Sequence, residues 1–449
     1  MKDFIDGYRL ICGLEIHVEL KTESKMFCGC KNDPFFAEKP NIYTCDYCLG
    51  RQTQVPVPNK KAIEYTIKFG LFVDGEIEQN SYFERKHYVY PDSPKGWQTS
   101  QCTKHFIKSG TIGTSFGDVH LLEAHLEEDM AKLIHKEVAG KKMTLIDFNR
   151  SGLPLVEIVS QPEIHSAEQA SEYAKNIQSI VRYLGIADAD MEKGQMRFDA
   201  NISLQTEEEC KNDQLPSYKV EVKNINTFKG LEQAIKFEID RQKELLDAGK
   251  QVPQETRGFD LETGVTTFQR EKGTLVDFNP TICPDMSKIE IGDELLAQWQ
   301  NELPDKISDV IVRWEKDFQI EPRFGEAFVK DRETYVWAND LFTKAQSEKL
   351  DVNKLASRLI NKKIDVEVGV DITKVIVEFK KMDEVADLDV SAVNVIIDEV
   401  LSSDIKAVEK YKAGQKQVIG VFVGQTRKKI EKKADANQVR DLVEKQLDN

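Results

Sequence analysis

The sequence predicts an α+β fold class for the first part of the chain and helices for the rest. Up to about residue 292, short stretches that alternate apolar and polar residues lie between Gly, Pro and Asn turns, with a few helical stretches among them. Beyond this point, apolar residues recur at helical spacing in DELLAQWQNELPDKISDVIVRWEKDF and TYVWANDLFTKAQSEKLDVNKLASRLI. A charged stretch near 381–388 precedes another helical run. We therefore predict three parts, at residues 1–292, 293–380 and 381–449.

Composition indicates a soluble, cytoplasmic protein. The chain has 449 residues, 40% of them hydrophobic, which is enough for two or three domains with a large core. No segment is long and apolar enough to cross a bilayer, and the first residues, MKDFIDGYRLICGLE, do not read as a signal peptide.

Charge is unevenly distributed along the chain. The net charge of −15 argues against unspecific coating of nucleic acid, which needs an excess of Lys and Arg. Residues 401–449 hold eleven Lys or Arg against seven Asp or Glu, a net charge of +4 that leaves −19 for the remainder. Any contact with nucleic acid therefore needs a locally basic surface.

Two predicted strands carry histidine and carboxylates on one face. In GLEIHVEL, Glu15, His17 and Glu19 alternate with apolar residues, and neighbouring side chains of a strand point to opposite faces. LLEAHLEED repeats the pattern, and its acidic residues could join His17 around one divalent cation. The alternatives are an ordinary half-exposed strand and a solvated acidic turn. The second pattern places Leu122, Ala124 and Leu126 on one face and Glu123, His125 and Glu127 on the other, followed by Glu128 and Asp129.

Four of the eight cysteines lie in a short stretch. Cys28 and Cys30 form a C-x-C pair, Cys45 and Cys48 form a C-x-x-C pair, and fourteen residues lie between the two pairs. Two thiolate pairs at this separation are typical of a tetrahedral zinc site. Reduced cysteines without a metal are the alternative. The other four, which we expect in the core or on the surface, are Cys12, Cys102, Cys210 and Cys283.

Common nucleotide-binding motifs are absent. The sequence contains no G-x-x-x-x-G-K-[ST] loop and no G-x-G-x-x-G fingerprint, so neither of these would hold a nucleotide. G-x-S-x-G occurs once, as GTSFG at residues 113–117, and this short pattern by itself does not indicate a serine hydrolase.

A series of motifs resembles one family, the GatB subunits of the aspartyl/glutamyl-tRNA(Asn/Gln) amidotransferase. The likeness covers nearly the whole chain, is weakest in the helical middle, and extends into the stretch from AVEKYKAG to VEKQL. It implies a cradle domain at 1–292 with an antiparallel sheet flanked by helices, an all-helical domain at 293–380, and a small helical tail domain at 381–449. The motifs are GLEIHVEL, KMFCGC, TCDYCLG, YPDSPKGWQTSQ, HLEEDMAKLIH, DFNRSGLPLVEIV, MRFDANISL, EVKNINTF and QETRGFD.

The resemblance implies an enzyme subunit that activates glutamyl-tRNA(Gln), and aspartyl-tRNA(Asn) as a second substrate. ATP would phosphorylate the side-chain carboxylate, and ammonia from a partner amidase subunit would displace the phosphate. A small third subunit would complete the heterotrimer. The implied cofactors are Mg²⁺, with ATP as a substrate, and structural Zn²⁺ at the cysteines.

The resemblance also assigns residues to the site. A structural ion pair is the alternative for each basic residue, and core packing is the alternative for the two tyrosines, which could meet the terminal adenosine or the aminoacyl group. The catalytic and Mg²⁺ set is Glu15, His17, Glu127 and Glu128, with Asp199 and Glu255 as further oxygen donors. The substrate and ATP contacts are Tyr88, Tyr90, Lys95, Arg197, Lys223 and Arg257.

The basic tail resembles the surface that would meet the tRNA body, with a solvated helical face as the alternative. The predicted contacts are Lys412, Lys416, Arg427, Lys428 and Lys429, within a larger group that adds Lys406, Lys410, Lys432 and Lys433.

The chain departs from the family pattern in three places. RQTQVPVPN follows the second cysteine pair where a Gly-Pro-Gly-like stretch is usual, Asn279 stands where Arg is expected, and Glu123 where relatives often carry Arg. These departures bear on nucleotide contacts. The departure at Asn279 favours a second hypothesis, a tRNA-binding scaffold with weakened catalysis. A metal-dependent phosphotransferase acting on another substrate is a third hypothesis.

Overall fold

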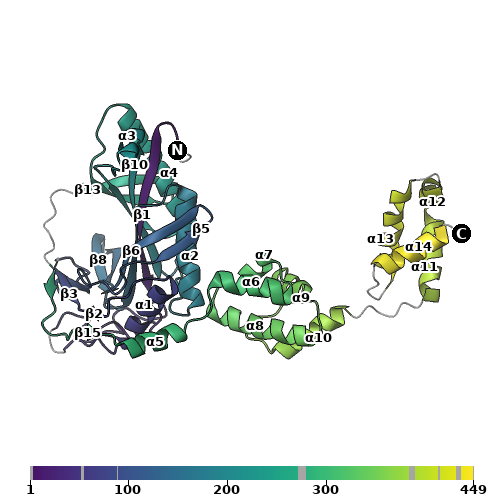
Figure 1. Ribbon diagram of the computed structural model, residues 1–449, viewed down its shortest axis with the longest axis horizontal. Coiled ribbons are helices and arrows are strands. Elements are labelled where there is room, and N and C mark those ends of the chain that lie inside the picture. The colour runs from purple at the N-terminus through teal and green to yellow at the C-terminus, as the bar shows by residue number, and fades with distance from the viewer. Residues whose placement is uncertain are drawn as a thin grey trace. The chain divides into compact units, whose positions relative to one another are not determined.

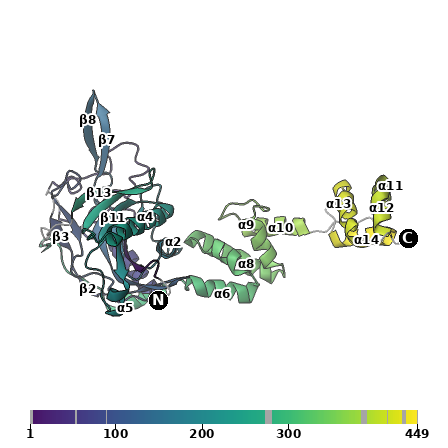
Figure 2. The same ribbon diagram turned by 90° about the horizontal axis from the view of Figure 1, so that it is seen from above.

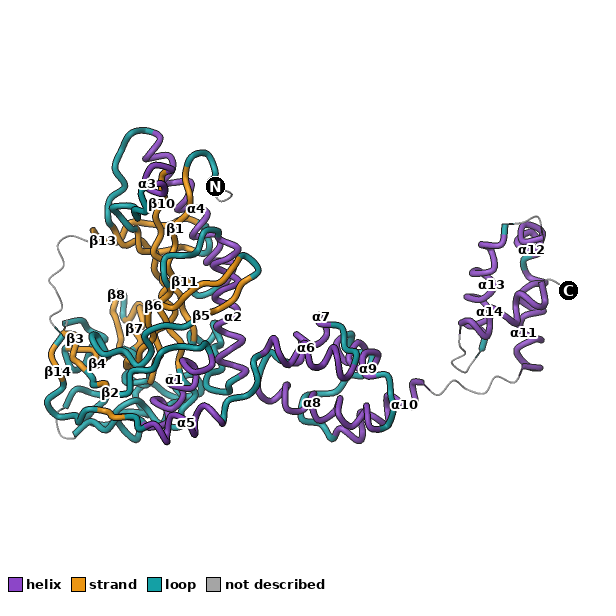
Figure 3. Tube along the Cα trace, in the orientation of Figure 1, coloured by secondary structure: helices purple, strands orange, loops and turns teal. Residues whose placement is uncertain are grey.

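The chain folds into two compact units, residues 1–338 and 339–449. A computed structural model describes residues 4–51, 55–87, 89–271, 280–383, 390–412, 415–430 and 436–447. Strands occur in the first unit, and the described part of the second unit contains helices and loops (Figures 1 and 3). The predicted α+β class is thus confirmed. The three-part division stays a prediction, and most of its second boundary falls on 384–389, outside the described residues.

One large, mainly antiparallel sheet forms the centre of the first unit. The pair β11 and β12 is parallel, and β5 (Thr111–Thr114) pairs only with β6. In spatial order, the strands are β13 (Val265–Glu271), β12 (Glu255–Asp260), β11 (Val220–Ile225), β10 (Met196–Thr206), β1 (Tyr8–Glu19), β9 (Pro154–Ser160), β6 (Gly117–Glu128), β4 (Trp97–Ser100), β3 (Glu84–His87) and β14 (Thr281–Ile282).

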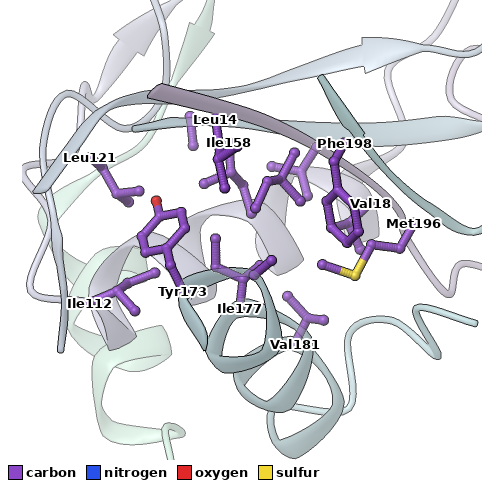
Figure 4. Close-up of a cluster of buried hydrophobic side chains, with 14 of the residues drawn as sticks. Leu14, Val18, Ile112, Leu121, Ile158, Tyr173, Ile177, Val181, Met196 and Phe198 are labelled. Atoms are coloured by element: carbon purple, nitrogen blue, oxygen red, sulfur yellow. The ribbon is translucent and has the colours of Figure 1, made fainter. Parts of the chain in front are cut away.

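The apolar face of the sheet is covered by two helices. Leu14 and Val18 of β1 are fully buried, and they pack with Phe198 of β10 against Tyr173 and Ile177 of α2 (Ala167–Tyr183), as Figure 4 shows. Helix α4 (Phe228–Asp247) contributes to the same core. Because strand side chains alternate, the residues between these apolar positions point to the opposite face, which we call the polar face.

Local sequence explains where these helices begin. The Ser166 hydroxyl accepts a hydrogen bond from the Gln169 amide at the start of α2, and the Thr227 hydroxyl accepts one from Gly230 at the start of α4. The other helices of the first unit are α1 (Lys60–Phe72), α3 (Glu207–Lys211), α5 (Asp293–Asn301), α6 (Ile307–Phe318) and α7 (Pro322–Phe328), and α8 (Arg332–Ser347) crosses into the second unit.

Two small sheets complete the first unit. The strands β7 (Lys132–Val138) and β8 (Lys141–Asp147) form a hairpin that stands out from the rest of this unit in Figure 2. The strands β2 (Asn80–Ser81) and β15 (Ile289–Glu290) form a short pair.

The second unit is helical in its described part. Helices α11 to α14 share a core that includes Val393, Ile397, Phe422 and Val443. No helix among the described residues is long and apolar enough to span a membrane. The helices are α9 (Val352–Ile360), α10 (Ile372–Asp383), α11 (Val390–Ser403), α12 (Ile405–Lys412), the 3₁₀ helix η1 (Lys416–Val418), α13 (Ile419–Lys429) and α14 (Ala436–Leu447).

Candidate functional site

Three side chains on the polar face form a group that we call the carboxylate–histidine cluster, His17, Glu127 and Glu157. The Nε2 atom of His17 lies 3.7 Å from an oxygen of Glu127 and 3.6 Å from an oxygen of Glu157. Strand register explains this, because Glu157 of β9 is paired with His17 on one side and with His125 of β6 on the other. The donor set suits a divalent cation.

Burial and like charges set the protonation states in this cluster. Burial lowers the pKa of His17 to about 4, so its imidazole is neutral at pH 7 and able to bind a metal. Burial and the charge of Glu157 raise the pKa of Glu127 to about 7. The Nδ1 atom of His17 is buried without a hydrogen-bond partner among the described residues. Two nearby buried carboxylates beside the Nε2 atom of a neutral imidazole indicate a group that a cation would stabilise.

Glu15 lies on the same face of β1, beside rather than inside this cluster. One of its oxygens accepts a 2.8 Å hydrogen bond from the Asn201 amide, and burial together with the charge of Glu157 raises its pKa. Its paired residue on β10 is Asp199, whose carboxylate is 2.9 Å from the ammonium of Lys223. Although burial opposes the charge, Asp199 raises the pKa of Lys223 to about 12, so the ammonium stays charged.

Arg197 lies on the same face, paired with His17 in the sheet register. Its guanidinium contacts Asp129 at 3.3 Å, and Arg150 contacts the same carboxylate at 2.5 Å. Although burial works against the charge, the two guanidinium groups lower the pKa of Asp129 to about 2. The side chain of Arg197 is 32% exposed and that of Lys223 33%, so both cations are accessible to an anionic substrate.

Glu128 does not join the cluster, which corrects the expectation that it would share the Mg²⁺ site. Neighbouring residues of a strand point to opposite faces, so Glu128 leaves β6 on the side away from Glu127. It contacts the ammonium of Lys95 at 2.5 Å and accepts a hydrogen bond from the Thr99 amide at 3.0 Å. The Lys95 side chain is 6% exposed, so here the structure shows the ion pair that was the alternative to a phosphate contact.

Glu255 and Arg257 are a second correction. Both side chains project toward α4, on the helix-covered side of the sheet, and form a buried ion-pair network with Glu238 and Arg241 of that helix. Arg257 contacts Glu255 at 2.8 Å and Glu238 at 3.2 Å. These residues are therefore placed to stabilise the fold rather than to contact a ligand on the polar face.

The four predicted cysteines come together. The sulfurs of Cys28 and Cys48 are 3.5 Å apart, those of Cys45 and Cys48 are 3.8 Å apart, and Cys30 completes the group. Four sulfurs bound to one tetrahedral zinc ion at its usual bond length would lie about 3.8 Å apart. A hydrogen bond from Cys28, helped by the nearby Lys25 ammonium, lowers the pKa of Cys48 to about 5, so this position favours a thiolate. The cluster could therefore bind a metal.

The cysteine loop also supports the segment that carries Lys95. Gly50 has a φ of +73°, and a Cβ atom there would overlap the carbonyl oxygen of Pro94. The Tyr47 hydroxyl, between Cys45 and Cys48, accepts a 3.1 Å hydrogen bond from Lys95. Glycine at position 50 is thus required for the loop to approach this closely.

Comparison with known proteins identifies the family. Residues 10–297 match the model of the GatB/GatE catalytic domain, and residues 340–447 match that of the GatB domain. The corresponding subunit of the aspartyl/glutamyl-tRNA(Asn/Gln) amidotransferase from Persephonella marina is 35% identical, over 97% of this chain and 99% of the relative. The chain belongs to the GatB family. Relatives of the same name from Nitratidesulfovibrio vulgaris and Thermodesulfovibrio yellowstonii are 32% and 33% identical over 98% of this chain and 99% of theirs. Because these relatives are named as one subunit of the amidotransferase, membership implies an enzyme of several subunits.

Sequence reasoning missed Glu157 in the family motif PLVEIV. It is a lone acidic residue in an otherwise apolar strand, and this signal could have identified it, because a buried carboxylate needs a partner. Sequence reasoning also placed Leu122 on the apolar face with Ala124, which was wrong. The register shifts between Leu121 and Glu123, so Leu122 bulges outward and is 47% exposed.

The remaining predicted contacts are only partly described. Tyr90 is 63% exposed, so it is not packed in the core, whereas Tyr88 and Asn279 lie outside the described residues. Lys432 and Lys433 also lie outside them. The other predicted basic contacts of the tail are exposed, namely Lys406, Lys410, Lys412, Lys416, Arg427, Lys428 and Lys429.

Proposed function

We propose that this chain is the ATP-using, tRNA-binding subunit of a glutamine-dependent tRNA amidotransferase that converts glutamyl-tRNA(Gln) into glutaminyl-tRNA(Gln). Aspartyl-tRNA(Asn) is the second substrate to test. The observation that carries the proposal is the position of His17 between Glu127 and Glu157, in a chain of the GatB family. A cytoplasmic location, expected from the sequence, belongs to the same proposal.

The chemistry needs two steps. An oxygen of the substrate carboxylate attacks the γ-phosphorus of ATP, the bond to ADP breaks, and an acyl phosphate forms. Ammonia then attacks the acyl carbon, the carbon–oxygen bond breaks, and phosphate leaves with one proton of the ammonia. Activation is required because a carboxylate is anionic at neutral pH and resists nucleophiles.

The carboxylate–histidine cluster fits Mg²⁺, with Glu15 as a further oxygen donor close by. His17 is neutral and nearly buried, and the pKa of Glu127, about 7, shows how costly a second negative charge is without a cation. When bound, Mg²⁺ would neutralise phosphate charge and help align the donor and acceptor oxygens.

The chain's own cations would orient the anionic groups. Arg197 of β10 and Lys223 of β11 lie on the polar face, each held by a carboxylate and each about one-third exposed. A phosphate or substrate carboxylate can therefore share these donors with Asp129 and Asp199. Fixed donors of this kind stabilise charge at the transferred phosphoryl group without having to reorganise.

The proposal includes zinc at the four cysteines and two partner proteins, an amidase that supplies ammonia and a small third subunit. Zinc would tie the loop of Cys45 and Cys48 to that of Cys28 and Cys30, beside the segment of Lys95. Metal analysis of the purified chain tests this part, because Cys48→Ser should hold about one equivalent of zinc less than the wild type.

The main test is a reconstituted complex with the amidase and the third subunit. Wild-type protein should show ATP hydrolysis that depends on glutamyl-tRNA, together with formation of glutaminyl-tRNA. His17→Ala should lose both activities, whereas His135→Ala, which changes an exposed histidine of β7, should retain them. If wild-type protein binds tRNA but never hydrolyses ATP, the chain is a scaffold. If it does not bind tRNA at low salt, a phosphotransferase acting on another substrate is favoured.

The tail is tested through the salt dependence of tRNA binding. Each phosphate contact contributes about −0.7 to −0.9 to the slope of log K against log salt. Replacing Arg427, Lys428 and Lys429 with Ala should therefore flatten the slope by about 2 units if all three contact phosphates. Arg440→Ala with Lys445→Ala, two exposed basic residues of the same tail outside the predicted set, is the matched control. An unchanged slope in the triple variant would remove the tail from the interface.

A further inference from the structure

A second group of ligand atoms lies beside the carboxylate–histidine cluster. The Nδ1 atom of His105 is 2.7 Å from an oxygen of Glu123, and the Nδ1 atom of His125 is 3.8 Å from the other oxygen. The two imidazole rings are 5.0 Å apart between centroids. One ligand atom from each residue lies within 4.8 Å of the other two, as the bonds to a single metal ion require.

The fold brings these residues together in two ways. Ile107 and Ala124 exchange backbone hydrogen bonds of 3.1 and 3.0 Å, which hold the segment of His105 against β6. The bulge at Leu122 directs Glu123 and His125 to the polar face.

His125 provides an independent observation that points to a ligand. Its side chain is 9% exposed, and its Nδ1 atom, which faces Glu123, is buried without a hydrogen-bond partner among the described residues. Its Nε2 atom is 3.3 Å from Glu157, a member of the first cluster. A histidine that binds a metal through one nitrogen commonly donates its other N–H to a carboxylate, which fixes the ring.

We propose that His105, Glu123 and His125 bind a second divalent ion of the zinc class, and that this ion holds His125 against Glu157. Two imidazoles and one carboxylate are a donor set that suits Zn²⁺ or Co²⁺ better than Mg²⁺, which prefers oxygen. The first cluster, with two carboxylates and one imidazole, offers more oxygen ligands and therefore suits Mg²⁺ better. The binding of this ion does not depend on the proposed function. Only its role in holding His125 against Glu157 of the first cluster rests on the proposed function.

The ordinary alternative is a histidine–glutamate ion pair, and the same strand provides one for comparison. His120 contacts Glu163 at 2.8 Å, but no third ligand atom from the described residues completes that pair. The His105 group differs from it by the second imidazole. The pair of His120 and Glu163 is therefore the matched control.

The test is a Co²⁺ titration of the full chain that already holds one equivalent of Zn²⁺ at its cysteines, in excess Mg²⁺. We expect one further equivalent of Co²⁺ with visible d–d absorption and no thiolate-to-cobalt charge-transfer band. His105→Ala and Glu123→Gln should each weaken this binding at least about tenfold, and His120→Ala should leave it unchanged. Thermal unfolding without metal checks that each variant is folded.

Three results would overturn the inference. The first is no cobalt absorption in the wild type, and the second is the same cobalt affinity in His105→Ala as in the wild type. The third is an absorption that is lost in His17→Ala but kept in His105→Ala, which would place the ion in the first cluster. Amidation measured on the same samples separates the two proposals. Failure of the amidation reaction with intact cobalt binding would count against the proposed function only.

Discussion

Two charged clusters occupy opposite faces of the same sheet, and they are built differently. On the helix-covered face, Glu238, Arg241, Glu255 and Arg257 alternate in sign, and each carboxylate contacts both guanidinium groups. The Thr266 hydroxyl also donates to Glu238. This network is complete without any ligand.

The polar face lacks such pairing around its histidines. Burial and the nearby charge of Glu157 raise the pKa of Glu127, and the Nδ1 atoms of His17 and His125 have no hydrogen-bond partner among the described residues. Burying charge without pairing destabilises a fold, so such an arrangement is expected where a ligand completes it. In this sheet the completeness of charge pairing, more than the number of charged residues, distinguishes a binding site from a structural network.

The largest expected effect is on catalysis by the polar face. Glu127→Gln should lower the rate of amidation on the order of a thousandfold, because it removes one of two carboxylates that would hold the cation at the phosphates. The measurement is single-turnover formation of glutaminyl-tRNA by the reconstituted complex.

The neighbouring residue provides the control for this prediction. Glu128→Gln leaves the nearly buried Lys95 without its carboxylate, so it should act mainly on stability, measured by denaturant unfolding. A larger loss of rate in Glu128→Gln than in Glu127→Gln would contradict the assignment of the two faces.

A substitution in the ion-pair network of the helix-covered face should lower stability and leave the amidation rate unchanged, the reverse of what we expect for Glu127→Gln. Glu238→Gln leaves Arg241 and Arg257 with one carboxylate between them, so the free energy of unfolding should fall by about 3 kcal/mol. The amidation rate per folded molecule should stay at the wild-type level. If this variant lost activity while keeping its stability, the network would belong to the active site.

Strand alternation was sufficient to predict part of this comparison. It placed His17 and Glu127 on polar faces of two strands, and those side chains do lie within 3.7 Å of each other. The same rule argues against Glu128, which was included in the predicted site as the next acidic residue of LLEAHLEED and which lies on the other face. Alternation depends only on the backbone geometry of the strand itself, so it predicted the correct face wherever the register was regular.

Other features depend on tertiary structure that no local pattern contains. The partners of Glu255 and Arg257 come from a helix that precedes them in the chain, and nothing in QETRGFD indicates which face α4 would cover. The bulge at Leu122 is likewise a property of the pairing between β6 and β9. Glu157 was detectable in principle, as the lone acid of an apolar strand.

The raised pKa of Glu127 predicts a pH dependence of stability. The pKa is about 7 in the folded chain and near 4.5 when unfolded, so the folded state binds more protons between these values and loses stability as pH rises through this window. Without divalent ions, Glu127→Gln should therefore be more stable than the wild type by about 3 kcal/mol at pH 8, with no advantage below about pH 4.5. Denaturant unfolding at several pH values in EDTA checks this, and excess Mg²⁺ should reduce the difference at pH 8. If the difference in stability between Glu127→Gln and the wild type were the same at pH 8 as below about pH 4.5, Glu127 would not be the titrating group.

The smallest effects come from two buried threonines that donate to carboxylates on opposite faces. Thr266 donates to Glu238 of the network, and Thr256 donates to Glu221 at 2.8 Å, beside Lys223 of the polar face. Thr266→Val should lower the free energy of unfolding by about 1.5 kcal/mol and leave amidation unchanged, because the two arginines still pair with Glu238. Thr256→Val should also reduce the amidation rate severalfold, because Glu221 helps to position the ammonium of Lys223. Both residues are nearly inaccessible to solvent and both substitutions are isosteric, so the two variants are matched. If both lowered the amidation rate equally, the helix-covered face would not be purely structural and the polar face would not be the functional one.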